Sequence, residues 1–469
     1  MDGHSFTKRE KRTVLAASCI AIFLNPLVGS MLNLALGAIQ ADFHCSEHNL
    51  GWIASVYFMV SVMTLLPASR LADIYGKKRI FLIGAVIVLV ASVLSALSPN
   101  IYVLYVFRGL TGVGTAFISC TSVSLISDVY GPHERGGALG INTACVYVGA
   151  SIGPTLGGVL TDFLGWRSIF FILVPMIVVA ALLMKSFKYE FTNTPGERYD
   201  SKGSTLYVVG IFILMFGIIS LPEIYAIVMI VVGSLMIIGF VRFESKEEYP
   251  IFHGELFESV RFRRSMVALT LNYASSFCVM FFLSRYLQGI GLLSPTEAGL
   301  VMMCQPAFQV VFTLIAGKLS DRMDKRILPT VGMAILCVGL AMLYAFTSKD
   351  IDYPMIILSQ IVMGIGFGIF SAPNTNAVMS YVKREHYNHA SGMISTFRQI
   401  GMMISMGLAT CLISIYMGTN TALEPSNYDE FITVMKVAWA ICIGFSVIGS
   451  IISWFRGSDI SEGEAESSQ

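Results

Sequence analysis

Charged side chains inside the apolar runs of this chain are the residues best placed to do chemistry. The chain has 469 residues, of which 55% are hydrophobic and 13% are charged. Arg108 and Arg398 fall deep within long apolar runs, and Arg285 falls near the end of another. A charge in such surroundings is costly and usually marks function. These cations could hold a solute or take part in proton transfer. Alternatively, Arg108 and Arg398 bond to neighbouring helices, and Arg285 reaches to the surface of the apolar layer.

The other residues narrow the chemistry. We find no Asp, Glu or His in the middle of any apolar run, no nucleotide-binding loop, and no cluster of nucleophiles or metal ligands. The nine cysteines are scattered singly, and the net charge of +1 argues against a nucleic-acid binder. The sequence therefore predicts neither an enzyme nor a cofactor or metal site. Asn33, Gln305 and Asn374 could line a cavity or hydrogen-bond between helices.

Hydropathy predicts an all-α polytopic membrane protein, because a membrane-spanning helix needs about 20 apolar residues and the charged fraction is low for a soluble domain. We keep the first run as a helix rather than a cleaved signal peptide, since it is long enough to span. Fourteen stretches qualify: 14–39, 50–69, 80–98, 101–126, 137–160, 168–185, 204–221, 224–241, 265–287, 297–316, 327–346, 354–380, 391–416 and 434–455.

The distribution of basic residues predicts the orientation. With the N-terminus inside, 25 of the 31 Lys and Arg residues fall in inner loops and tails. Basic residues favour the cytoplasmic side of a membrane. We therefore expect a multi-pass protein of the plasma membrane with both termini in the cytoplasm.

A short charged loop occurs twice and divides the chain into halves. Residues 69–79 read SRLADIYGKKR, and residues 317–326 read GKLSDRMDKR, which places Asp73 and Asp321 248 residues apart. Either copy alone could be an ordinary basic inner loop. A fainter echo relates 108–114 (RGLTGVG) to 360–366 (QIVMGIG). The recurrence predicts two pseudo-equivalent six-helix halves.

This repeat predicts the domain organisation. We expect an N-terminal six-helix bundle and a C-terminal six-helix bundle, separated by an inserted pair of helices and two cytoplasmic linkers. The second linker contains Leu256-Phe257, spaced as for a short interfacial helix. The predicted segments are 1–185 for the first bundle, 186–202 for the first linker, 203–243 for the inserted pair, 244–262 for the second linker, 263–456 for the second bundle and 457–469 for a disordered acidic tail.

A glycine-rich pattern marks the fifth apolar run, whose residues 149–158 read GASIGPTLGG. Glycines four residues apart give one helix face without side chains, so that another helix can approach closely. Pro154 removes a backbone hydrogen bond and bends the helix. The face could be a pivot or ordinary close packing. It comprises Gly149, Gly153, Pro154, Gly157 and Gly158.

The paired loops, the RGLTGVG run and GASIGPTLGG together resemble motifs of the major facilitator superfamily. Fourteen spans with an inserted pair resemble its drug:proton antiporter branch, as do GWRSIF at 165–170, DSKG at 200–203 and FRQIG at 397–401. The resemblance covers nearly the whole chain. It implies two bundles that rock about a central cavity, with the substrate site near the midplane.

The resemblance also implies roles for residues. Arg108 matches an arginine associated with proton transfer, and Asn33, Gln305, Asn374 and Arg398 are our further candidates for a substrate or proton pathway. One departure stands out, because Val28 occupies the position of an acidic residue usual in the branch. The loops match a cytoplasmic gate, for which we name Asp73, Gly76, Lys77, Lys78, Arg79, Asp128, Arg135, Asp321, Arg322 and Arg326.

The leading hypothesis is a secondary transporter that exports small amphipathic compounds by alternating access, with protons as the coupling ion. The protein is expected to act as a monomer in the lipid bilayer. An alternative is a dedicated exporter of an anionic metabolite, for which Arg108 and Arg398 would supply the counter-charges. A non-transporting sensor or scaffold is a third hypothesis, but it would not need the gate loops or the glycine face.

Overall fold

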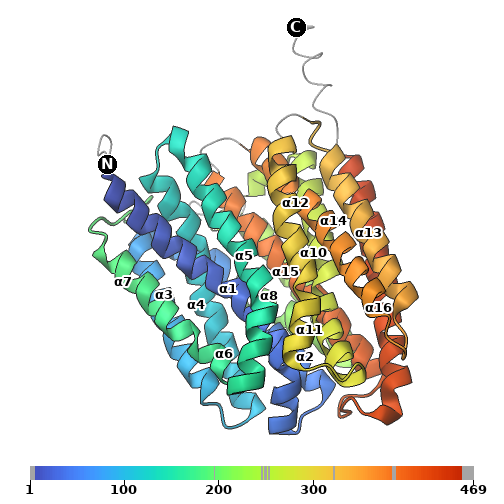
Figure 1. Cartoon of the computed structure of the whole chain (residues 1–469). Coiled ribbons are helices and arrows are strands. Elements are labelled where there is room, and N and C mark those ends of the chain that lie inside the picture. The colour runs from blue at the N-terminus through green and yellow to red at the C-terminus, as the bar shows by residue number, and fades with distance from the viewer. Residues whose placement is uncertain are drawn as a thin grey trace. The chain divides into compact units, whose positions relative to one another are not determined.

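The computed structural model describes residues 6–194, 196–244, 247, 251, 254–320, 323–382 and 387–456. Within these ranges the regular secondary structure is entirely helical (Figure 1). Fourteen helical segments are long and apolar enough to cross a membrane. Each corresponds to one of the fourteen stretches predicted from hydropathy, so the predicted fold class is confirmed. The predicted acidic tail, 457–469, lies outside the described residues.

The chain divides into two compact units. The first consists of Met1–Cys45 and Trp52–His253, and the second of Ser46–Gly51 and Gly254–Gln469. The first unit contains α1 (Lys8–Phe43), most of α2 (Glu47–Tyr75), α3 (Lys77–Ala96), α4 (Ile101–Val129), α5 (Pro132–Leu164), α6 (Ser168–Phe171), α7 (Leu173–Ser186), α8 (Ser201–Ile219) and α9 (Ile224–Glu244).

The second unit contains the remaining helices and the first turn of α2. Its helices are η1 (Gly254–Phe257), α10 (Val260–Arg285), η2 (Tyr286–Ile290), α11 (Pro295–Met302), α12 (Cys304–Ser320), α13 (Ile327–Phe346), α14 (Tyr353–Ser380), α15 (Tyr387–Tyr416), η4 (Pro425–Asn427) and α16 (Tyr428–Trp454). The η1 turn coincides with the expected interfacial helix, although it is only 4 residues long. The boundaries proposed for bundles, linkers and inserted pair stay predictions.

Polar side chains set several helix starts, because the first backbone N–H groups of a helix have no partner within it. Thr7 and Glu10 form a capping box at α1, and Ser294 and Glu297 form another at α11. Ser46 Oγ accepts a hydrogen bond from the backbone N of Asn49 at 3.3 Å. This contact starts α2 earlier than its apolar run does, and so brings Glu47 into the helix.

The glycine-rich face of α5 packs directly on α1. A Cβ at Gly149 would lie 2.5 Å from the carbonyl oxygen of Phe23, and one at Gly157 would lie 2.5 Å from Met31 Cα. Gly153 has Ser30 Cβ equally close, at 2.5 Å. These distances leave no room for a side chain on three successive turns. The helices therefore approach at backbone distance, as expected from the sequence.

The internal repeat is visible as equivalent glycine contacts in the two units. In the first unit, a Cβ at Gly114 on α4 would lie 2.8 Å from the carbonyl oxygen of Gly84 on α3. In the second unit, a Cβ at Gly366 on α14 would lie 2.8 Å from that of Gly332 on α13. The two sequence echoes thus place the same kind of helix contact in each unit.

The close contact between α5 and α1 yields a prediction with an internal control. Gly157→Ala should lower the free energy of unfolding by about 1–3 kcal/mol, because the added methyl group overpacks against the backbone of α1. Gly140→Ala, on the same helix, should be neutral or slightly stabilising, since nothing lies within 4 Å of that position. Thermal unfolding of the purified variants in detergent measures the difference. Equal melting temperatures for both would contradict the contact.

Candidate functional site

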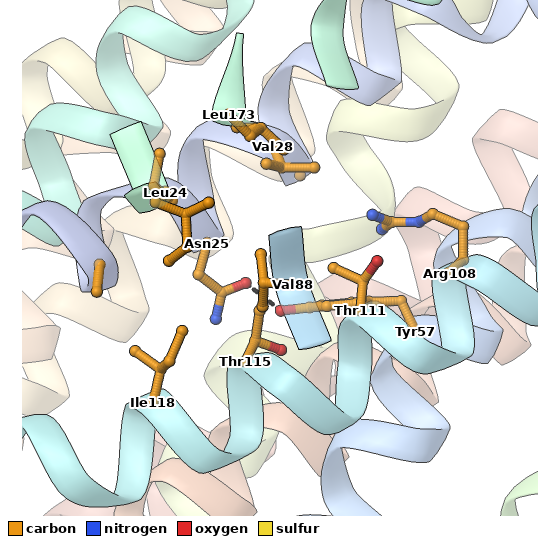
Figure 2. Close-up of a pocket in the computed structure, with 13 residues that line it drawn as sticks. Leu24, Asn25, Val28, Tyr57, Val88, Arg108, Thr111, Thr115, Ile118 and Leu173 are labelled. Atoms are coloured by element: carbon orange, nitrogen blue, oxygen red, sulfur yellow. Dashed lines mark hydrogen bonds between the residues drawn. The ribbon is translucent and has the colours of Figure 1, made fainter. Parts of the chain in front are cut away.

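A small, mostly apolar cavity with a polar patch lies inside the first unit, lined by α1, α2, α3, α4 and α7 (Figure 2). Asn25 comes from α1, Tyr57 from α2, and Arg108, Thr111 and Thr115 from α4. The Tyr57 hydroxyl donates a hydrogen bond to Asn25 Oδ1, and Figure 2 shows the two side chains pointing toward one another. Apolar residues complete the lining: Ala21, Leu24, Val28, Val88, Ile118, Leu173 and Ile177, with Gly29.

Arg108 is buried in this wall with a relative exposure of only 2%. Its guanidinium carbon lies 4.7 Å from the centre of the Tyr57 ring, and Nε lies 3.5 Å from the carbonyl oxygen of Ile53. Its Nη1 has no hydrogen-bond partner within the described part of the chain. Neither of these neighbours carries a full negative charge, so within the described residues the buried cation is stabilised by a ring face and a distant carbonyl dipole.

The size of the cavity limits what it can hold. Its volume is about 20 Å³, which is room for roughly one water molecule. An organic solute does not fit in this conformation. Hydroxyl and amide groups around a water-sized space next to a buried cation can instead relay a proton or bind one water.

Asn25 and Tyr57 are members of this cluster that the sequence analysis missed. A single amide or phenol within an apolar run carries no periodic signal. The available clue was Tyr57 itself, since a buried tyrosine hydroxyl usually has a hydrogen-bond partner. Predicted Asn33 lies elsewhere on α1, where its Nδ2 donates to the carbonyl oxygen of Gly29 at 3.2 Å.

A second arginine stands over a tyrosine in the second unit. The guanidinium carbon of Arg398, on α15, lies 5.5 Å from the centre of the Tyr273 ring on α10. That ring meets Phe367 of α14 edge to face, with centroids 5.0 Å apart. Arg398 Nε is buried without a hydrogen-bond partner in the residues described. The cluster therefore combines a cation with aromatic surface.

The predicted amides of the second unit fall into two kinds. Gln305 is 6% exposed and its Oε1 has no hydrogen-bond partner among the described residues. The side chain is therefore available to a polar ligand that reaches it. Asn374 is fully buried and engaged, because its Oδ1 accepts from Arg456 Nη2 at 2.6 Å and its Nδ2 donates to the Ser265 carbonyl at 3.4 Å. These bonds connect Asn374 to α10 and to a residue just after α16, and its role in a substrate or proton pathway stays a prediction.

The predicted gate loop between α2 and α3 is tied to its own unit. Lys77 is 1% exposed, and its Nζ lies 2.6 Å from Asp128 Oδ2 at the end of α4. The Asp73 side chain has a different partner from that of Asp128. Its Oδ1 accepts from Asn193 Nδ2 at 2.7 Å, and its carbonyl oxygen accepts from the backbone N of Asn193 and of Thr194.

Residues 187–194 and 196–198, which we call the strap, follow α7 and lie against this loop. Glu190 Oε1 accepts from the backbone N of Lys78 at 2.8 Å, and the Lys78 ammonium donates to the carbonyl of Phe187. Gly76 has φ of +112°, and a Cβ there would lie 2.5 Å from Glu190 Cδ. Glycine is therefore needed for both the backbone angle and the space.

The other predicted gate residues are less constrained. Arg79 is exposed and Arg135 is partly exposed. Arg326 pairs with Asp324 at 3.0 Å and lies 4.9 Å from the Trp454 ring centre. Asp321 and Arg322 lie outside the described residues. Equivalence of the two loops as gates therefore stays a prediction.

The expectation that Arg285 reaches the membrane surface is wrong. Arg285 is 4% exposed, and its Nη2 lies 2.6 Å from Oε1 of Glu47, which is fully buried. The sequence analysis overlooked Glu47 because it precedes the second apolar run. His48 likewise belongs to α2 and not to a loop.

The sequence is similar to a family of membrane transporters. The family model for the Major Facilitator Superfamily matches residues 18–243 and 265–468. The multidrug resistance protein Stp of Mycobacterium tuberculosis (strain CDC 1551 / Oshkosh) is 28% identical over 423 residues, covering 89% of this chain and 78% of the relative. The riboflavin transporter RibZ of Clostridioides difficile (strain 630) is 27% identical over 457 residues, covering 95% of this chain and 98% of the relative.

Solved structures agree on the fold. A bacterial homologue of the human lysosomal transporter Spinster aligns with a TM-score of 0.71 and 16% sequence identity. The alignment covers 96% of this chain and 98% of that one. At this identity the likeness concerns the fold alone.

The buried Lys77–Asp128 pair leads to a prediction about stability. Lys77→Met should lower the free energy of unfolding by about 1–3 kcal/mol, because it leaves the largely buried Asp128 carboxylate without its donor. Arg79→Met, two residues away, should change it little, since Arg79 is exposed. Thermal unfolding in detergent compares the two. If both variants melt like the wild type, the pair does not stabilise the loop.

Proposed function

Because the chain belongs to the major facilitator superfamily and is a multi-pass membrane transporter, we propose that it exports small amphipathic compounds by alternating access, driven by proton antiport. We place it in the plasma membrane with both termini in the cytoplasm. The excess of basic residues in one set of loops supports this orientation.

The relatives support transport of small organic compounds, and the one named for multidrug resistance supports export. One is named for multidrug resistance and another for riboflavin transport. Both functions concern small organic solutes, and neither requires the protein to do covalent chemistry. The glycine contacts between α5 and α1 suit a transporter that moves packed helices with little side-chain interlocking.

The observation that carries the proton coupling is the buried Arg108 beside the Tyr57 and Asn25 pair. A proton that enters the water-sized cavity meets hydroxyl and amide groups that can pass it on. The nearby guanidinium opposes a second positive charge, so occupancy by a proton or by a cationic solute group is kept transient. A transient site is what an exchange of protons for substrate needs.

Arg108 and Arg398 support a preference for substrates without positive charge. Among the described residues neither Arg108 nor Arg398 contacts a carboxylate. A permanent dication would therefore enter a region where cations lack compensation, whereas a neutral or anionic amphiphile would not. We propose neutral and anionic amphiphiles as the preferred substrates.

A dedicated exporter of one anionic metabolite is the second candidate. The observation that favours it is Arg398 over Tyr273, with Phe367 at the edge of the ring. This cluster could hold a planar acid by charge and by stacking. The width of the substrate range distinguishes the two candidates.

Transport in proteoliposomes under an imposed pH gradient tests the proposal. We expect uphill movement of neutral and anionic amphiphiles, and uptake of a dicationic dye at least about tenfold slower, because each uncompensated charge contact costs more than about 1.4 kcal/mol. Movement of one compound alone would favour the dedicated exporter. Vigorous electrogenic transport of the dication would refute the charge preference, and no response to the gradient would refute antiport.

Arg108→Ala should uncouple transport from the pH gradient. Removing the guanidinium takes away the charge that keeps proton occupancy transient, so we expect gradient-driven accumulation to fall at least about tenfold while downhill exchange remains. Arg108→Lys keeps the charge and should retain partial coupling. Accumulation and exchange are measured at several pH values in the same vesicles. An unchanged pH dependence in Arg108→Ala would leave Arg108 a structural residue.

A further inference from the structure

The first turn of α2 holds an ion pair that is buried within the second unit. Glu47 is 0% exposed and Arg285, at the end of α10, is 4% exposed. Arg285 Nε lies 2.9 Å from Oε2 of Glu47, and Nη2 lies 2.6 Å from Oε1. This two-pronged geometry is the strongest that a guanidinium and a carboxylate can form. Residues Ser46–Gly51 accordingly group with the second unit, whereas α2 from Trp52 onward groups with the first.

The rest of this turn is seated closely on α15. His48 Nδ1 and Ser414 Oγ are 2.9 Å apart, and the backbone N of Glu47 donates to the carbonyl oxygen of Thr421 at 3.1 Å. A Cβ at Gly51 would lie 2.2 Å from Thr410 Cγ2. The ion pair, two further hydrogen bonds and this close contact together hold the turn against α10 and α15.

Glu47 differs from the other acidic residues that the structure describes. Two of them, Glu47 and Glu244, are almost wholly buried. Glu244 closes the end of α9 and accepts from the backbone N of Ile251 at 2.6 Å. Glu47, by contrast, pairs with an arginine. No Asp or Glu lies in the middle of a predicted span, and none among the described residues lines the cavity beside Arg108. An acid that binds the proposed coupling proton would therefore stand outside that cavity.

Protonation of Glu47 and the ion pair exclude one another. A neutral acid would leave the buried Arg285 guanidinium beside a partner without charge, which is strongly unfavourable. Conversely, the carboxylate in the seated turn is 0% exposed, and both of its oxygens accept hydrogen bonds from Arg285. Proton binding therefore requires that the first turn of α2 leave α10 and α15.

We propose that Glu47 is the carboxylate that binds the coupling proton, an assignment that rests on the proposed antiport. When the turn is released, Glu47 is hydrated and accepts a proton from hydronium, which becomes water. When the turn is seated again, Arg285 stabilises the carboxylate, and the proton returns to water. Seating and protonation alternate, which links the proton to the conformation of the helix that carries it.

The other groups around this turn do not replace Glu47 in that role. From α10 the charged group is Arg285. On α2 the second titratable group is His48, which faces the hydroxyl of Ser414 on α15. Further contacts from α15 and its following loop include Thr410 and Thr421, which do not titrate. His48 is therefore the competing candidate, and the experiment includes it.

The test separates coupling from exchange in proteoliposomes, with a fluorescent amphiphile that the wild-type protein transports. Glu47→Gln keeps the size of the side chain but cannot ionise. We expect gradient-driven accumulation to fall at least about tenfold, with substrate counterflow at equal pH within about twofold of wild type. Glu47→Asp, which can still ionise, should recover part of the accumulation. Glu297→Gln is the matched control, because Glu297 caps α11 and pairs with no cation among the described residues.

Each result decides the matter. Accumulation by Glu47→Gln equal to wild type would overturn the role of Glu47 and leave antiport intact, whereas a wild-type protein that ignores the gradient would overturn antiport itself. Loss of counterflow together with accumulation would make Glu47 structural, and loss of coupling in His48→Gln alone would move the proton to His48. If Glu47→Gln does not fold, the double variant Glu47→Gln with Arg285→Met removes both charges and must show the same uncoupling.

Discussion

A charge buried among membrane-spanning helices loses the favourable free energy of its hydration, so neighbouring groups must stabilise it. This protein uses two arrangements. Lys77 and Arg285 each meet a carboxylate, Asp128 and Glu47, at the end of a helix. Arg108, in the part of the chain that the structure describes, contacts the face of Tyr57 and a carbonyl group and no carboxylate. The first arrangement fixes helix ends, whereas the second leaves a cation whose field remains available to a solute or a proton.

The internal repeat explains where these charges can stand. Gly112 on α4 meets the carbonyl oxygen of Tyr57, and Gly364 on α14 meets that of Gln305, so each unit brings the same pair of helices to backbone distance. One turn before the glycine stands Arg108 in the first unit and Gln360 in the second. The scaffold is thus duplicated, while the polar group that it presents has diverged from a charge to an amide.

The sequence predicted the fourteen helices because a span must be long and apolar, which is a strong local signal. It did not predict that Glu47 lies in a helix, because the apolar run begins after Glu47. The start of α2 instead depends on the hydroxyl group of Ser46. The burial of Arg285 depends on a residue 238 positions away. Partners at such separation leave no pattern in one sequence. The pairing of Tyr57 with Asn25 was hidden for the same reason.

The strap shows how an inserted helix pair becomes part of the fold. A linker that only joined α7 to α8 would need no contact with the α2–α3 loop. Here Arg70 pairs with Glu197 at 2.5 Å, and the backbone N of Lys77 donates to the carbonyl oxygen of Phe191 at 3.0 Å. An extended segment has no periodicity, so its partners could not be inferred from hydropathy. The Asp73 carboxylate accepts a hydrogen bond from Asn193 of the strap. Any movement of this loop must therefore also displace the strap. The linker to the predicted inserted helices thus belongs to the predicted gate.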